Sequence, residues 1–88
     1  MIEFKASDLV FLSKLDLKVE VTAIEQVDDD KQKPYWILQI VAENRDFKKN
    51  GILHGARGEI RKFYQLNSAI EACKKFMSNV KEIKVTII

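Results

Sequence analysis

The feature that most constrains the fold is a strict alternation of apolar and polar residues that begins at Leu15. Apolar side chains occupy every second position through Ala23, and charged or hydroxylated side chains occupy the positions between them. This period of two is that of a β-strand with one buried face and one solvated face. The strand is expected to end near Val27, where a polar loop follows. The pattern therefore predicts a strand over residues 15–27 in a sheet with one covered face.

Two further strands are predicted, one just before the middle of the chain and one at its C-terminal end. Residues 35–42 are apolar on both faces apart from Gln39, and aromatic and β-branched side chains are prominent there. This composition suits a central strand that a helix covers on one side and that is partly covered on the other. Regular alternation over residues 81–88 predicts a C-terminal strand. That strand is expected either at the sheet edge beside the 15–27 strand or against a second copy of the chain.

Glycine-containing pairs predict the turns between strands. Asn50-Gly51 is the strongest hairpin signal in the sequence, because both central residues of a type I′ turn have positive φ. Gly58 predicts a second turn or a bulge, since glycine adopts backbone conformations that are closed to its neighbours. We therefore expect a third strand over residues 52–56. Residues 59–65 are expected to form a fourth strand or the second half of a bulged one.

One stretch has the spacing of an amphipathic helix. Ser68 and Glu71 form a capping-box pattern, so the helix is expected over about 68–79. Its apolar stripe consists of Ala69, Ile70, Cys73, Phe76 and Met77. We expect the stripe to pack against apolar strand residues, namely Val19, Val21, Ile37 and Ile40. Residues 1–14 fit either a short helical turn or a buried strand, and we interpret them as irregular or short helical structure.

Together these elements predict an α+β fold. We expect an antiparallel sheet of four to five strands, one main helix over about 68–79 packed on one face, and a C-terminal strand. The 88 residues leave room for a single domain, 1–88. One cysteine excludes an internal disulfide, and the charged N-terminal segment lacks the apolar core of a secretion signal. Because no apolar run approaches the roughly 18 residues of a membrane span, we expect a cytoplasmic protein without a membrane partner.

The sequence contains no motif for catalysis, for a metal or for a cofactor. His54 is the sole histidine and Cys73 the sole cysteine, so one chain cannot supply a zinc site. We interpret His54 as a strand residue that makes a structural hydrogen bond, and Cys73 as a small buried hydrophobe. The run Asp28–Asp30 lacks the spacing of a calcium loop and is expected to be a solvated turn. The protein is therefore expected not to be an enzyme, with no catalytic residues, no metal and no cofactor.

Positive charge is concentrated in one part of the chain. The net charge is +2, but residues 44–64 hold six cationic side chains against two carboxylates, a local charge of +4 that leaves −2 for the remainder. The six cations are Arg45, Lys48, Lys49, Arg57, Arg61 and Lys62. Aromatic residues lie between them, and a two-stranded basic ribbon can neutralise phosphates or enter a major groove. This cluster predicts binding to DNA or RNA. The alternative is a protein-interaction or assembly module, such as a homodimer through edge strands, with no nucleic-acid ligand.

The order of elements from Tyr35 to Met77 resembles the arm-type DNA-binding domains of phage integrases. The resemblance rests on a strand, a turn, a strand with Gly58-Glu-Ile-Arg-Lys-Phe63, a polar cap, and the helix Ala69-Ile-Glu-Ala-Cys-Lys-Lys-Phe76. It implies a three-stranded sheet that enters the major groove and a setting in a mobile element. The chain departs from that pattern in its long first strand, its acidic loop, its C-terminal strand and the Asn-Gly pair at the tip.

Overall fold

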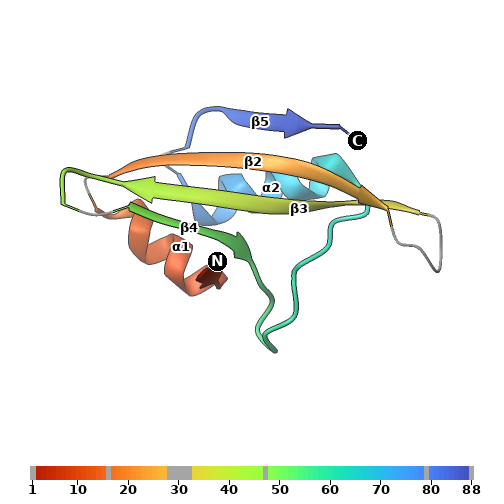
Figure 1. Ribbon diagram of the computed structural model, residues 1–88, viewed down its shortest axis with the longest axis horizontal. Coiled ribbons are helices and arrows are strands. Elements are labelled where there is room, and N and C mark those ends of the chain that lie inside the picture. The colour runs from red at the N-terminus through yellow and green to blue at the C-terminus, as the bar shows by residue number, and fades with distance from the viewer. Residues whose placement is uncertain (1, 16, 28–32, 47, 79, 88) are drawn as a thin grey trace.

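The computed structural model describes residues 2–15, 17–27, 33–46, 48–78 and 80–87. Five strands form one sheet in the order β1-β4-β3-β2-β5, and two helices pack against it (Figure 1). The elements are β1 (Ile2–Phe4), α1 (Ala6–Ser13), β2 (Lys18–Val27), β3 (Pro34–Glu43), β4 (Lys48–Leu53), α2 (Leu66–Phe76) and β5 (Ile83–Thr86). The α+β class is therefore confirmed, as are the long strand before the acidic run, the central strand and the C-terminal strand.

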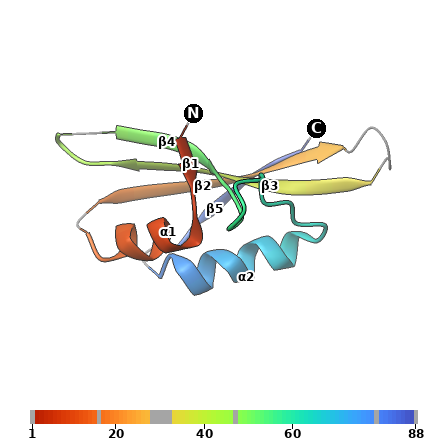
Figure 2. The same ribbon diagram turned by 90° about the horizontal axis from the view of Figure 1, so that it is seen from below.

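The sheet is mixed, so the expectation of an antiparallel sheet is wrong for its two edges. The inner pairs β2–β3 and β3–β4 are antiparallel, whereas β1 pairs in parallel with β4 and β5 in parallel with β2. Helix α1 connects β1 to β2, and helix α2 connects β4 to β5. Each crossover returns the chain so that the two strands it joins run in the same direction. Because β2 and β4 also run in the same direction, each edge strand is parallel to its neighbour. Both helices lie on the same face (Figure 2), which leaves the other face without a covering layer among the described residues.

The structure contains a short second helix, α1, in addition to the one main helix that was expected, which agrees with the interpretation of residues 1–14 as irregular or short helical structure. The first turn of α1 is stabilised by Asp8, whose carboxylate accepts a hydrogen bond of 2.8 Å from the backbone N–H of Lys5. This contact is half of a capping box. Leu9 and Leu12 are buried and bring α1 into the core. Because α1 has only eight residues, its periodicity could not be told from that of a buried strand.

The hairpin between β3 and β4 turns earlier than expected. Asn50-Gly51 lies inside β4, where Gly51 stands opposite Ile40 on one side and Ile2 on the other. The connection begins at Asn44, whose side-chain oxygen accepts a 2.8 Å hydrogen bond from the backbone N–H of Asp46. This Asx contact shows that the turn chemistry comes from Asn44. Pairing of β4 with strands on both sides therefore overrides the local turn preference of Asn50-Gly51.

Residues 59–65 do not form a strand. They make two isolated bridges, His54 with Ile60 and Trp36 with Phe63, which is closer to the bulged alternative than to a separate fourth strand. Gly58 has φ +89°, as the predicted turn requires. The chain thus leaves the sheet after β4, turns at Gly58 and rejoins it at β3.

The expected capping box of the main helix is also wrong. Helix α2 begins at Leu66 with Gln65 at its N-cap, no side chain caps it, and it ends at Phe76 instead of residue 79. The bridge at Phe63 already fixes the entry of the chain, and this tertiary contact sets the start of the helix two residues earlier than Ser68.

The core lies between the sheet and the two helices. It contains Phe4, Leu9, Leu12, Val21, Ala23, Leu38, Ile40, Ala42, Leu53, Phe63, Ala69, Ala72, Cys73 and Met77. The predicted packing is correct for Val21, Ile40, Cys73 and Met77 and for the partly buried Val19 and Phe76, but it is wrong for Ile37 and Ile70, which lie outside this cluster. Ile37 and Ile40 are three residues apart, so they lie on opposite faces of β3. Burial raises the pKa of the Cys73 thiol to about 11, and the thiol is therefore protonated and unreactive near neutral pH.

Candidate nucleic-acid interface

The structure divides the six predicted cations between two ends of β3. Lys48 stands opposite Glu43 at the end of β3, with Arg45 in the turn beside it. Phe63, which follows Arg61 and Lys62, bridges to Trp36 near the start of β3. Since Trp36 and Glu43 are separated along one strand, the two groups lie about 23 Å apart. The six cations therefore do not form one continuous surface.

The group at the β3–β4 hairpin mixes both signs of charge. The Lys48 ammonium lies 3.9 Å from a carboxylate oxygen of Glu43. Lys49 points to the other face of β4, where it lines a hollow of about 580 Å³ together with Glu3 and Asp8. The remaining lining of that hollow is apolar and comes from Phe4, Phe11, Leu12 and Leu15. Carboxylates therefore accompany two of the three cations in this group.

The second group lies on the segment from His54 to Tyr64, here called the 54–64 loop. Two backbone hydrogen bonds close its tip: the Gly55 N–H donates to the Glu59 carbonyl at 2.7 Å, and the Gly58 N–H donates to the Gly55 carbonyl at 3.0 Å. The Arg61 N–H then donates to the Leu53 carbonyl at 3.0 Å, which attaches the returning arm to the end of β4. The loop is thus a tight projection with Arg57 at its tip, and Arg57 is exposed.

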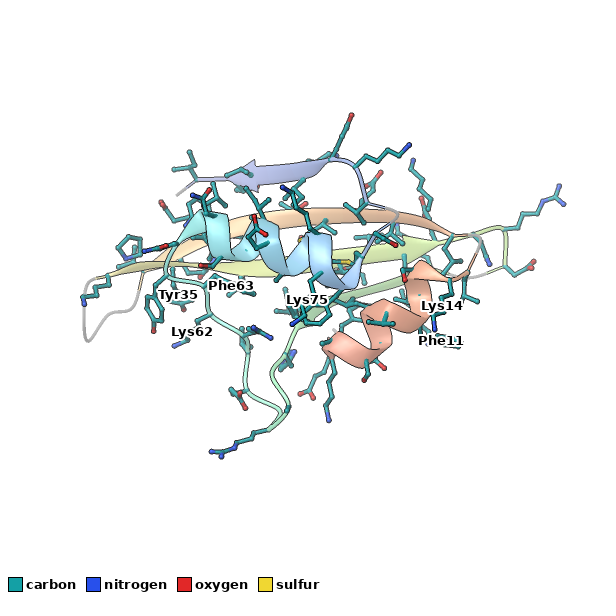
Figure 3. The ribbon with its side chains drawn as sticks, turned by 180° about the vertical axis from the view of Figure 1, so that it is seen from behind. Phe11, Lys14, Tyr35, Lys62, Phe63 and Lys75 are labelled. Atoms are coloured by element: carbon teal, nitrogen blue, oxygen red, sulfur yellow. The ribbon has the colours of Figure 1, made fainter. Side chains whose placement is uncertain are left out.

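Cations and aromatic rings meet where this loop rejoins the sheet. The Lys62 ammonium lies 4.8 Å from the centre of the Tyr35 ring, and the Tyr35 and Tyr64 rings lie 6.2 Å apart at an angle of 58°. The Arg61 guanidinium lies 5.2 Å from the centre of the Phe63 ring. These distances are those of cation–π and tilted aromatic contacts. Figure 3 shows Lys62 and Tyr35 side by side at one end of the molecule, with Phe11 and Lys14 of the α1 region at the other.

Phe63 anchors this arrangement. Its side chain is buried, and its backbone exchanges two hydrogen bonds with Trp36, of 2.6 and 2.9 Å. Neighbouring residues of an extended segment alternate, so Arg61 lies over Phe63 on the helix side and Lys62 lies over Tyr35 on the other side. The helices cover Phe63 but leave Tyr64 52% exposed. Arg61, Lys62, Tyr35 and Tyr64 are called the basic-aromatic cluster below.

The sequence pattern did not reveal that Tyr35 belongs to this cluster. Tyr35 lies far from the 54–64 loop along the chain, and only the Trp36–Phe63 bridge brings the two together. The available signal was the position of Tyr35 directly after Pro34, at the start of a strand. Tyr35 and Trp36 are neighbours in that strand, so their side chains point to opposite faces of the sheet. That signal places the ring on an outer face but does not identify its neighbours.

The cluster borders an open hollow of about 690 Å³. Its lining consists of Gly55, Ala56, Glu59, Ile60, Arg61 and Lys62. The charged lining therefore holds two cations and one carboxylate, and the local charge is positive. Arg57 at the loop tip adds a further cation close along the chain. This combination of positive charge and an aromatic pair, of which Tyr64 is exposed and Tyr35 half-buried, is suited to a ligand that has both anionic and planar aromatic groups.

The remaining polar residue of the loop, His54, has a structural environment. Its Nδ1 lies 2.8 Å from the Ile52 carbonyl oxygen, which can only accept, so Nδ1 carries the proton. Its Nε2 lies 3.8 Å from a carboxylate oxygen of Glu3 on the neighbouring strand. In the described ranges, no three or more His, Cys, Asp or Glu side chains gather into a possible metal site. Neither described helix has the length and apolar character needed to cross a bilayer.

Comparison with known proteins adds no relative to this picture. No protein-family model, curated protein or solved structure matches this chain.

Proposed function

We propose that this protein is a small non-catalytic nucleic-acid-binding protein and that it binds through the 54–64 loop and Tyr35. The observation that carries the proposal is the basic-aromatic cluster, in which the Lys62 ammonium lies against the Tyr35 ring and the exposed Tyr64 ring lies beside Tyr35. Tyr64 offers a ring face on which a base can stack, a contact worth about 1–3 kcal/mol per base. Lys62 lies on the same side as Tyr64, over the Tyr35 ring, and Arg57 and Arg61 add positive charge elsewhere on the loop that phosphates can contact.

The same geometry favours single strands over duplexes. Bases in a duplex are already stacked on one another, so an exposed tyrosine gains a stacking partner only from an unpaired base. The face of the sheet away from the helices is less suited to a major groove. Its central strand presents Ile37, Gln39 and Val41 there. Two of the cations on this face lie beside carboxylates, Lys48 beside Glu43 and Lys18 beside Glu20. The proposal therefore rests on the loop. Docking into a major groove and a mobile-element setting, which the resemblance to integrase domains implies, stay predictions.

The test is a fluorescence-anisotropy titration of labelled single-stranded DNA, single-stranded RNA and duplex DNA at a series of salt concentrations. We expect single strands to bind more tightly than the duplex. Three phosphate contacts give an expected slope of about −2 for the logarithm of the binding constant against the logarithm of salt concentration. Absence of binding at low salt, or binding whose strength does not change with salt, would contradict the proposal.

A further inference from the structure

The edge strand β5 exposes both its backbone and apolar side chains. It stands at the end of the strand order, and within the described part of the chain its partner is β2 alone. Its outer N–H and C=O groups are therefore available for another strand. Val85 is 44% exposed, and Ile87, which directly follows β5, is 71% exposed. Val85 and Ile87 alternate with Ile83, so they lie on the same face of the strand. Ile83 stands opposite Val21, on the helix side of the sheet.

The opposite edge of the sheet has protection that β5 lacks. Strand β1 has three residues, and the middle one is the charged Glu3. Short length and charge are two devices by which proteins block unwanted pairing at a sheet edge. Within β5 the single charged residue is Lys84, which stands opposite Thr22 on the face away from the helices. The exposed apolar row of β5 thus carries no charged side chain of its own.

We infer that β5 pairs with β5 of a second copy, so that two sheets join into one across a two-fold axis. Such an axis requires the two strands to run antiparallel with one residue opposite its own copy. Centring the pair on Val85 places Ile83 opposite Ile87 of the second copy and Lys84 opposite Thr86 of the second copy. Every apolar side chain of the row then meets another apolar side chain, and no like charges stand opposite each other.

The registers centred on Lys84 and on Ile83 satisfy the sequence less well. Centring the pair on Lys84 sets two ammonium groups directly opposite each other, which is destabilising. Centring it on Ile83 moves Ile87 past the end of the opposing β5 strand, so its exposed side chain gains no partner. The strand is therefore self-complementary in the Val85-centred register. The 54–64 loop leaves the sheet from β4, on the far side of β3 from β5, so this pairing leaves the basic-aromatic cluster uncovered (Figure 1).

Position 86 tests both the dimer and its register. By light scattering and sedimentation, the parent chain is expected to approach twice the protomer mass of 10.2 kDa as its concentration rises. Thr86→Lys sets a lysine opposite Lys84 of the second copy in two symmetric places, which should raise the dimer dissociation constant by about twofold to thirtyfold. Thr86→Glu sets a carboxylate there instead and should lower the same constant. Because Thr86 is exposed, neither variant is expected to disturb the protomer, which circular dichroism checks.

The matched control is Ser68→Lys, which adds the same charge at an exposed position of α2. It should leave the dissociation constant unchanged. A parent chain that stays monomeric at every concentration overturns the inference. Equal effects of lysine and glutamate at position 86 overturn the Val85-centred register. Neither measurement involves nucleic acid, so the outcome is independent of the proposed function.

Discussion

Replacing Leu9 with alanine is expected to lower the free energy of unfolding by about 2–5 kcal/mol. Leu9 lies in α1, is 0% exposed and belongs to the core between the helices and the sheet. The substitution removes apolar contacts and leaves a cavity that the surrounding side chains fill only in part. Since the free energy of unfolding of a small domain is about 5–15 kcal/mol, this loss is a large fraction of the total stability. The measurement is a urea titration, and a thermal melt should show a midpoint lower by about 10 °C or more.

The control is the next residue, Val10, which is 38% exposed on the same helix. Val10→Ala should change the free energy of unfolding by about 0.5 kcal/mol, as is usual for surface positions. The contrast between the neighbours depends on α1 packing through Leu9. Equal destabilisation by both substitutions, or none by either, would contradict the described placement of α1.

Replacing Arg57 and Arg61 together with alanine is expected to weaken binding to single-stranded nucleic acid by about tenfold to hundredfold at low salt. Both side chains are exposed cations of the 54–64 loop. Loss of two phosphate contacts should also flatten the salt dependence, by about 1.4 in the logarithmic slope. The fold should survive, because the main structural loss is the contact of Arg61 with Phe63, worth about 0.5–1 kcal/mol. Anisotropy titrations of parent and variant measure both quantities.

A matched control removes the same charge from the other end of β3. Arg45 and Lys48 are also exposed cations, and replacing both with alanine changes the net charge by the same amount. Since carboxylates accompany this group, the control should retain most of the affinity and most of the salt slope. If the two double variants lose affinity equally, binding follows net charge alone, and the 54–64 loop is not the interface.

Much of the fold follows from side-chain periodicity. The alternation from Leu15 to Ala23 predicts most of β2, and the apolar run over 35–42 predicts most of β3. The helical stripe with Cys73 and Met77 predicts α2 and much of its contact with the sheet. Each of these segments is long enough for its period to be distinctive.

Features that depend on long-range contacts could not be predicted in the same way. Alternation is the same in parallel and antiparallel strands, so it does not give the direction of β1 or β5. Asn50-Gly51 has the chemistry of a hairpin turn, but flanking strands on both sides keep Gly51 inside β4. The same limit applies to the candidate site. Charge density identified the stretch that contains Arg57, Arg61 and Lys62, whereas the aromatic partner Tyr35 reaches them only through the pairing of Trp36 with Phe63.

The most direct test of the proposed interface is a ¹H–¹⁵N correlation spectrum recorded while a short single-stranded oligonucleotide is added. If the basic-aromatic cluster binds the strand, the amide signals that shift most should belong to residues 54–64 and to Tyr35, with smaller changes in β5 and α1. Shifts that concentrate instead on the hairpin around Arg45 and Lys48, or a spectrum that does not change, would contradict the central claim.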